Sequence, residues 1–432
     1  MLKHLPDGLI LRSLSEGFAS DQQQLPAFYA QVNGEGDPPH QQAAIAAWTQ
    51  DLITNHPTTT LDDIFVIVDP SQQDRIASAT LLIPQQWSYA GLPIAVGRPE
   101  LVGTHPDYRS RGLVRALFEV VHERSAALGH QLQVITGIPY FYRQFGYTMA
   151  VDLGSHLTFP LHVPAQPAPG YQPAFHLRPA TPADTPALAR WHDAFARTRL
   201  LTALRSPDEW RYEITGRSPA SAQCMSYQII VNAAGEGVGY LELYDFQWES
   251  HLINCSAYVV GDESSYLETF NDVMLAVRQW AIARYGECPA ILSIAAGVHE
   301  SVDTLVAQTF GGKIQPNEYM WYIRLPDTIA FLHHIRPVLE ARLHHSGAHR
   351  YTGELKIGFY DLTGISLRFE QGRLTEITAI RGKDGYDIAF PWNLFWNVLF
   401  GDHTRADIDR ITPETQPTPK GALLLDILFP KQ

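Results

Sequence analysis

Residues 105–130 read HPDYRSRGLVRALFEVVHERSAALGH, and they place three arginines around the start of an expected helix. The N-terminus of a helix carries a partial positive charge, so acidic side chains normally occupy its first turn. Here Arg109, Arg111 and Arg115 lie there instead, and the first acid within the helix is Glu119. The stretch therefore concentrates positive charge at a helix N-terminus, where a bound anion would be needed to offset the repulsion.

The residues around this turn predict a strand, a turn and a helix. The segment ELVGT at 100–104 is typical of a strand, Pro106 ends it, and apolar residues of 113–128 recur at helical spacing. Gly112 at the helix start has no Cβ, so a ligand could approach the backbone closely. Free backbone N–H groups, the helix dipole and the guanidinium groups together form a site for a phosphate. The alternative interpretation is an exposed basic helix start with surface arginines.

Composition and charge restrict the class of protein. The 432-residue chain is 45% hydrophobic and 18% charged, with a formal net charge of −13. Such a chain is typical of a folded globular protein with roughly two to four domains. General nucleic-acid binding needs a basic face, so it is not expected. The three cysteines, Cys224, Cys255 and Cys288, form no CxxC pair, so neither a zinc site nor a disulfide framework is expected.

Targeting and membrane segments are not expected either. The apolar run at the start of the sequence is short and is interrupted by Arg12, unlike a secretory signal peptide. No apolar stretch approaches the roughly twenty residues that span a bilayer. We therefore expect a cytoplasmic protein without a membrane span.

The chain contains a domain-sized internal repeat on either side of a proline-rich linker. LILRSLSE, from Leu9, is echoed by FHLRPATPAD, from Phe175, and strands followed by a turn and a long helix come after both. Beyond Asp327 the pattern changes to strands joined by short glycine-containing turns, without a repeat partner. The predicted fold is α+β, with mixed sheets. The predicted parts are a first domain at 1–160, a linker at 161–174, a second domain at 175–327 and a third at 328–432.

The second copy of the repeat serves as an internal control. Its equivalent turn reads GDESSYLETF, with Asp262, Glu263 and Glu268 where the first copy has arginines. An acidic helix start is well capped but repels phosphate. Only the first copy is therefore expected to bind an anion.

The arginine-rich stretch resembles the coenzyme A loop of the GNAT acetyltransferase superfamily. That loop reads Arg/Gln-x-x-Gly-x-Gly/Ala, matched here by Arg109 and Gly112, with Val114 in place of the small residue. The resemblance implies acetyl-CoA as cosubstrate, with its pyrophosphate on the backbone of the 110–114 turn and its pantetheine amides paired with the preceding strand. The residues implied for acetyl-CoA are Val102, Gly103, Thr104, Arg109, Ser110, Arg111, Gly112, Leu113 and Val114.

The segment GIPYFYRQFGYTMA at 137–150 resembles the region after the fifth strand of that superfamily. There a tyrosine, matched by Tyr142, acts as general acid and protonates the leaving thiolate of coenzyme A. The alternative is that Tyr142 belongs to a buried aromatic cluster with its neighbours. The equivalent position of the second copy is Ala307, so that copy lacks both the anion turn and the acid.

Two GNAT-like copies, the second degenerate, followed by a third domain, resemble the layout of the Eis-like (enhanced intracellular survival) acetyltransferases. The resemblance implies a sterol-carrier-protein-like third domain, a homo-oligomer that is often hexameric, and amine substrates that include aminoglycosides. It also implies that the terminal carboxylate enters the active site as a base or anchor. Here that carboxylate belongs to Gln432, three residues beyond Phe429.

Three further residues are candidates for the acceptor side. Glu100 is a possible base for the amine proton, and an ion pair with Arg98 is the alternative. Trp87 and Tyr89 either line an acceptor pocket or pack within a hairpin. The histidines have no spacing that favours a metal site, so no metal is expected.

The sequence thus predicts an acetyl-CoA-dependent N-acetyltransferase that acts on an amine directly, in a ternary complex. The acceptor could be aminoglycoside-, polyamine- or lysine-like, because no motif marks its pocket. One alternative is a non-catalytic regulator or scaffold that binds acyl-CoA. Another is a lipid-binding protein that acts through residues 328–432.

Overall fold

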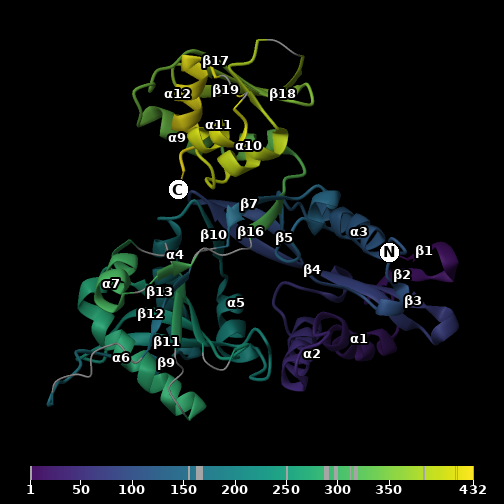
Figure 1. The fold of residues 1–432 in the computed structure, drawn as a ribbon, viewed down its shortest axis with the longest axis vertical. Helices are drawn as coiled ribbons and strands as arrows, with labels where there is room; N and C mark the ends of the chain where they lie inside the picture. Colours follow the sequence, from purple (N-terminus) through teal and green to yellow (C-terminus); the bar gives the residue numbers. More distant parts are fainter. Residues whose placement is uncertain are drawn as a thin grey trace.

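The computed structural model describes residues 2–153, 156–161, 169–249, 252–286, 291–295, 300–311, 313–315, 320–382, 385–413, 415 and 417–431. The described residues form three sheets with helices around them. Figure 1 shows the C-terminal part, in yellow, above two larger parts that lie side by side. Cys288 and Gln432 lie outside the described residues, so the role expected for the terminal carboxylate falls there too.

The first sheet contains most strands of the N-terminal part. Its order is β1-β2-β3-β4-β5-β6-β16-β7, and β10 adds to β4. The strands are β1 (Lys3–His4), β2 (Ile10–Ser13), β3 (Ile64–Asp69), β4 (Arg75–Tyr89), β5 (Leu92–Thr104), β6 (Leu132–Ile135), β7 (Thr148–Asp152), β10 (Leu201–Leu204) and β16 (Met320–Arg324).

Helices cover both faces of this sheet. Strand β3 reads IFVIVD and is buried on both sides, as a continuous apolar run predicts. Ile64 and Val66 face the cluster under α1 (Ala19–Asn33) and α2 (Pro39–Thr54). Phe65 faces the cluster under α3 (Leu113–Ala127), on the opposite side. The helix predicted after the arginine-rich turn is thus α3, and its apolar stripe packs on the sheet.

The second sheet has the order β15-β8-β14-β13-β12-β11-β9. Its strands are β8 (His156–Pro160), β9 (Phe175–Pro179), β11 (Met225–Asn232), β12 (Gly237–Tyr244), β13 (Leu252–Val260), β14 (Ile291–Ala295) and β15 (Lys313–Gln315). The accompanying helical segments are α4 (Thr185–Ala196), α5 (Pro207–Arg211), the π-helical turn η7 (Tyr212–Gly216), α6 (Tyr266–Tyr285) and α7 (Glu300–Phe310). Mixed sheets with helices agree with the predicted fold class.

The two sheets exchange one strand each. Strand β16 lies between β6 and β7 of the first sheet, with Tyr322 opposite Ile135. Strand β8 lies between β14 and β15 of the second sheet, with Leu157 opposite Ile294. The boundaries expected at 160 and 327 lie after β8 and after β16, so each of these strands pairs with a sheet across a boundary. An alternating apolar pattern fixes which face of a strand is buried, but not which sheet receives it.

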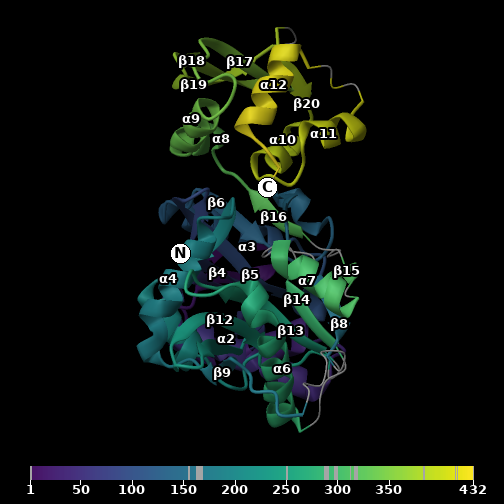
Figure 2. The same ribbon diagram turned by 90° about the vertical axis from the view of Figure 1, so that its left-hand side faces the viewer.

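The C-terminal part is an α+β unit docked on the first sheet (Figures 1 and 2). Its sheet has the order β19-β18-β17-β20. The elements are α8 (Thr328–His334), α9 (Arg336–His344), β17 (Gly353–Phe359), β18 (Thr363–Glu370), β19 (Arg373–Arg381), β20 (Ile388–Phe390), α10 (Trp392–Leu399), α11 (Arg405–Ile411) and α12 (Pro419–Leu428). One buried cluster joins its core to Val134 and Ile323 of the first sheet. The Asn397 amide also donates to the Met149 carbonyl at 2.8 Å.

A buried ion pair connects the start of α1 to β2. Arg12 is 4% exposed and Asp21 is 0% exposed, and Asp21 accepts two hydrogen bonds from Arg12, at 2.8 and 2.9 Å. We expect Asp21→Ala to lower the free energy of unfolding by about 3–5 kcal/mol, because Arg12 keeps only Asp74, at 3.4 Å. Denaturant unfolding measures this loss.

The matched control for that variant is Glu123→Ala, which breaks the exposed pair between Lys3 and Glu123. An exposed pair contributes about 0–1 kcal/mol, so the control should unfold close to the parent protein. Equal losses in both variants would contradict a special role for the buried pair.

Candidate active site

Strands β5 and β6 separate in the middle of the first sheet. They are parallel and pair only at Val96–Leu132 and Gly97–Gln133 within the described residues. Beyond this point β5 continues to Thr104 along β4, with a bulge where Leu101 has φ 50°. Backbone groups of 98–104 on the β6 side are therefore available to an extended ligand, which could pair with them as a strand does.

The turn after β5 leads into α3 through two residues in the left-handed region. Ser110 has φ 64° and Gly112 has φ 75°. Gly112 precedes the first residue of α3, and no side chain caps the helix start. A Cβ at Gly112 would meet nothing within 4 Å, so the glycine is needed for its positive φ and leaves open space beside the helix. This geometry exposes backbone N–H groups at the positive end of the helix.

A cavity of about 570 Å³ lies between the open strand edge and this turn. All nine residues expected to contact acetyl-CoA line it: Val102, Gly103, Thr104, Arg109, Ser110, Arg111, Gly112, Leu113 and Val114. The remaining walls come from Val32 of α1, from Tyr108 and Arg115, and from Ile138, Phe141, Gln144 and Phe145 after β6. Residues predicted from a motif thus share one cavity.

The three arginines of the turn all line this cavity. Arg109 is half-exposed and pairs with Glu35, Nη2 to Oε2, at 2.5 Å. The Arg111 guanidinium lies over the Tyr108 ring at 5.0 Å, and that of Arg115 lies over the Phe145 ring at 5.5 Å. Aromatic contacts hold these guanidinium groups in place while their N–H groups remain able to bind an anion.

Tyr142 lies beside the cavity in a buried aromatic cluster. It is 5% exposed, and its ring contacts those of Phe118 and Tyr322 at 5.7 and 5.5 Å. Tyr142 does not line the cavity itself, whereas Ile138 and Phe141 do. Burial raises the pKa of Tyr142, and the negative charge of Glu100 raises it further, so the phenol keeps its proton. Tyr142 thus lies in the buried aromatic cluster that was its alternative, and its neighbour Phe141 lines the cavity.

Glu100 is engaged by its neighbour on β5. Its Oε2 accepts from Nη2 of Arg98 at 2.5 Å, and its Oε1 accepts from the Leu101 backbone at 3.2 Å. The structure therefore contains the Arg98–Glu100 ion pair, which was the alternative to a role for Glu100 as a base.

Trp87 and Tyr89 lie away from the cavity and pack against the C-terminal part. Trp87 is 6% exposed and meets the Trp321 ring edge-on at 5.7 Å. Tyr89 is fully buried, and its hydroxyl donates to the Leu399 carbonyl at 2.7 Å. The expectation that they line an acceptor pocket is corrected, because the ends of β4 and β5 extend beyond the site and form the contact with α10.

The second copy retains a cavity of about 530 Å³ at the equivalent place, with Asp262 in its wall. Its turn is shorter, and Ser265 caps α6 by accepting from the Glu268 backbone at 3.3 Å. The Tyr266 hydroxyl accepts from the Val260 backbone at 3.4 Å, where the first copy has an open strand edge. The acidic, capped helix start agrees with the interpretation that this copy does not bind phosphate.

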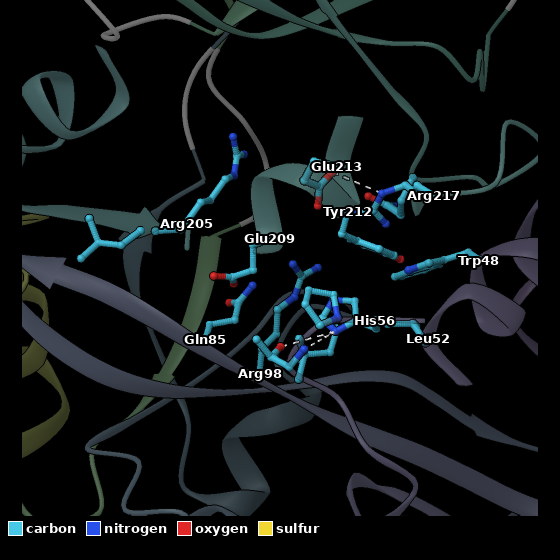
Figure 3. Close-up of a pocket in the computed structure, with 16 residues that line it drawn as sticks. Trp48, Leu52, His56, Gln85, Arg98, Arg205, Glu209, Tyr212, Glu213 and Arg217 are labelled. Carbon is cyan, nitrogen blue, oxygen red and sulfur yellow. Dashed lines mark hydrogen bonds and ion pairs between the residues drawn. The ribbon is translucent and has the colours of Figure 1, made fainter. Parts of the chain in front are cut away.

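A third cavity, of about 230 Å³, lies between the first and second parts and was missed by the sequence analysis (Figure 3). Backbone contacts such as Ala222 N–H to the Ala44 carbonyl, at 3.0 Å, hold α2 against the second part. The polar lining residues are His56, Thr58, Gln85, Arg98, Arg205, Glu209, Tyr212, Glu213, Arg217 and Gln223. These residues come from distant segments of the sequence. The one available signal is that Arg98 lies two residues before Glu100, which the sequence had already marked as a candidate base.

Two further findings concern the described part of the chain. Its histidine, cysteine and carboxylate side chains form no group of three that could hold a metal ion. None of its described helices combines the length and the apolar character needed to cross a membrane.

Comparison with known proteins supports the assignment of the first part. Residues 24–150 match the family model of the acetyltransferase (GNAT) domain. This range contains the open strand edge, the arginine-rich turn and Tyr142. No curated protein matches the sequence.

Solved structures share the fold along almost the whole chain. A probable N-acyltransferase of unknown function from Enterococcus faecalis V583 has a TM-score of 0.63 and 13% identity, over 100% of this chain and 98% of its own. A GCN5-related N-acetyltransferase from Anabaena variabilis ATCC 29413 has a TM-score of 0.65 and 15% identity, over 98% of both chains. Eis1 from Mycobacterium abscessus has a TM-score of 0.59 and 14% identity, over 98% of this chain and 97% of its own. The chain therefore carries a GNAT acetyltransferase domain at 24–150, within a longer fold that these structures share.

Proposed function

We propose that the chain transfers the acetyl group of acetyl-CoA directly to an amine. The observation that carries this proposal is the cavity that combines an open strand edge with an arginine-rich, left-handed turn at the start of α3. The edge formed by Val102 and Thr104 suits the pantetheine amides. The 110–114 backbone and Arg109 suit the pyrophosphate, which would replace Glu35 as the partner of this guanidinium.

The proposed reaction proceeds in a ternary complex. The neutral amine attacks the thioester carbonyl, a C–N bond forms, and the C–S bond then breaks. Tyr142 gives its proton to the leaving sulfur, and its raised pKa ensures that the proton is present at neutral pH. The nitrogen loses its extra proton to solvent or to the carboxylate of Glu100. No covalent enzyme intermediate is needed.

The two alternative functions differ from the transferase in what they do with a bound molecule. A non-catalytic regulator would bind acetyl-CoA in the same cavity without releasing thiol. A lipid carrier would need an apolar cavity in 328–432, and the described residues there contribute many buried side chains to a cluster shared with the first sheet. The resemblance to the Eis-like acetyltransferases also predicts that residues 328–432 are sterol-carrier-protein-like and that the chain forms a homo-oligomer, often a hexamer. Both stay predictions.

The test is thiol release from acetyl-CoA with panels of amino acids, aminoglycosides, polyamines and lysine peptides. We expect release that depends on one class of amine and exceeds hydrolysis without amine. Binding of acetyl-CoA is measured in parallel by calorimetry. Binding without release for any amine would favour the regulator, and absence of binding would contradict the assignment of the cavity.

A further inference from the structure

Strand β16 brings a tyrosine of the second copy into the aromatic cluster that contains Tyr142 (Figure 1). This residue, Tyr322, lies opposite Ile135 of β6, and its side chain is 0% exposed. Successive side chains of a strand point to opposite faces, so its neighbour Trp321 packs against the cluster shared with the C-terminal part instead. The second copy thus places one aromatic side chain directly beside the proposed acid of the first.

Tyr322 contacts the segment that carries Tyr142 in two ways. Its ring meets the Tyr142 ring edge-on, with the centroids 5.5 Å apart. Its hydroxyl donates to the Ile138 carbonyl at 3.2 Å, and the Phe141 N–H donates to the same carbonyl at 3.2 Å. Ile138 and Phe141 also line the cavity proposed for acetyl-CoA. The hydroxyl therefore restrains a segment that is both a wall of this cavity and the support of the phenol.

Gly137 limits the position of the phenol from another side. It has φ 136°, a backbone conformation that favours glycine. A Cβ at this position would lie 3.3 Å from Cε2 and 3.4 Å from the hydroxyl oxygen of Tyr142. The edge of the phenol that carries the proton thus lies against the backbone of residue 137. Movement of the segment that begins there would move this edge with it.

The position of this edge matters for a general acid. Proton transfer requires the acid to lie within hydrogen-bond reach of the atom that it protonates, and small displacements of reacting groups lower the rate strongly. A phenylalanine at position 322 would keep the ring contact with Tyr142. Packing alone therefore does not require the hydroxyl, and the hydrogen bond to Ile138 is the contact that only tyrosine provides.

We propose that Tyr322 is a positioning residue for Tyr142. Its hydroxyl holds the Ile138 carbonyl, its ring holds the phenol, and the active site of the first copy is thereby completed by a side chain of the second. The effect on catalysis rests on the proposed function above, whereas the restraint on residues 138–142 does not.

The first experiment measures the kinetics of Tyr322→Phe, which removes the hydroxyl and keeps the ring. We expect kcat to fall about 3- to 10-fold, the kinetic equivalent of one neutral hydrogen bond. KM for acetyl-CoA should stay close to the parent value, because the arginine-rich turn and the open strand edge keep all their residues. A loss in kcat with KM unchanged indicates an effect on the transition state.

The second experiment combines Tyr322→Phe with Tyr142→Phe in a double-mutant cycle. If Tyr322 acts through Tyr142, its hydroxyl has nothing to position once the acid is gone. We therefore expect Tyr322→Phe to leave kcat unchanged in the Tyr142→Phe background. A residue that only stabilises the fold would lower kcat by the same factor in both backgrounds.

The third experiment measures backbone hydrogen exchange and needs no turnover. Loss of the Tyr322 hydroxyl should speed exchange of the 138–142 amides, which include the Phe141 N–H, about 3- to 10-fold. The matched control is Tyr258→Phe, which removes a buried hydroxyl of the second copy that lies 2.6 Å from Oγ1 of Thr269. This control should change neither kcat nor exchange at 138–142.

A loss in kcat that disappears in the Tyr142→Phe background, with faster exchange at 138–142, supports the proposal. An unchanged kcat in Tyr322→Phe, or the same loss in both backgrounds, overturns it, while acetyl transfer itself stands. If Tyr142→Phe alone has no effect, Tyr142 is not the acid and the positioning role is overturned with it. If no amine releases thiol, the proposed function fails, and hydrogen exchange then decides the restraint: faster exchange supports it and equal exchange overturns it.

Discussion

Replacing Tyr142 by phenylalanine is expected to lower kcat by about 10²- to 10⁴-fold, the usual range for loss of a general acid. The thiolate of coenzyme A would then leave without a proton donor. KM for acetyl-CoA should remain unchanged, because Tyr142 does not line the cavity that contains the turn. Steady-state kinetics with the acceptor found in the panel measures both constants.

The matched control is Tyr147→Phe in the same aromatic cluster. Tyr147 is 1% exposed, and its hydroxyl lies 3.1 Å from Nε2 of His122. This variant loses a buried hydroxyl of the same kind without removing the proposed acid, so kcat should stay close to the parent value. Equal losses in both variants would assign the effect to packing of the cluster and remove Tyr142 from the mechanism.

Acetyl-pantetheine, which lacks the nucleotide and the pyrophosphate, is expected to have a kcat/KM about 10²- to 10⁴-fold below that of acetyl-CoA. The missing contacts are two or more charge-assisted hydrogen bonds to the arginine-rich turn, each contributing about 1.5–3 kcal/mol. We expect Arg109→Gln to raise KM for acetyl-CoA about 10- to 100-fold and to leave acetyl-pantetheine unaffected.

Arg190→Gln provides the control for this charge change. Arg190 pairs with Glu263 at 2.8 Å in the second part, beside the acidic helix start. Arg190→Gln should leave KM and kcat/KM unchanged for both acetyl-CoA and acetyl-pantetheine. If Arg109→Gln slowed both donors equally, the guanidinium would act through the fold and not through the pyrophosphate.

The sequence could predict which residues share the cavity proposed for acetyl-CoA, because its determinants are local. Arg109 and Gly112 lie within one turn, and the left-handed φ of Gly112 follows from its missing side chain. The positions of strand and helix follow from apolar spacing. A short contiguous segment thus contains both the backbone conformation and the charge that the site needs.

The cavity between α2 and the α5–η7 segment could not be predicted in this way. His56, Arg98 and Tyr212 come from three separate segments, and each has an ordinary neighbourhood in the sequence. What distinguishes Tyr212 is a buried hydroxyl that has no hydrogen-bond partner among the described residues, a property that arises only when the chain folds. Likewise, Trp87 and Tyr89 look like pocket aromatics in the sequence, and only the position of α10 shows that they are core.

The exchange of β8 and β16 has a consequence for the order in which the chain can fold during synthesis. The Tyr322 hydroxyl donates to the carbonyl of Ile138, 184 residues earlier in the chain. The GNAT domain at 24–150 therefore leaves the ribosome with an unfilled slot between β6 and β7, and it stays incomplete until the second copy has been made. Contacts of such long sequence separation form slowly and leave strand edges exposed to aggregation meanwhile. The second copy thus contributes to the GNAT domain by supplying the strand without which the first sheet cannot close between β6 and β7.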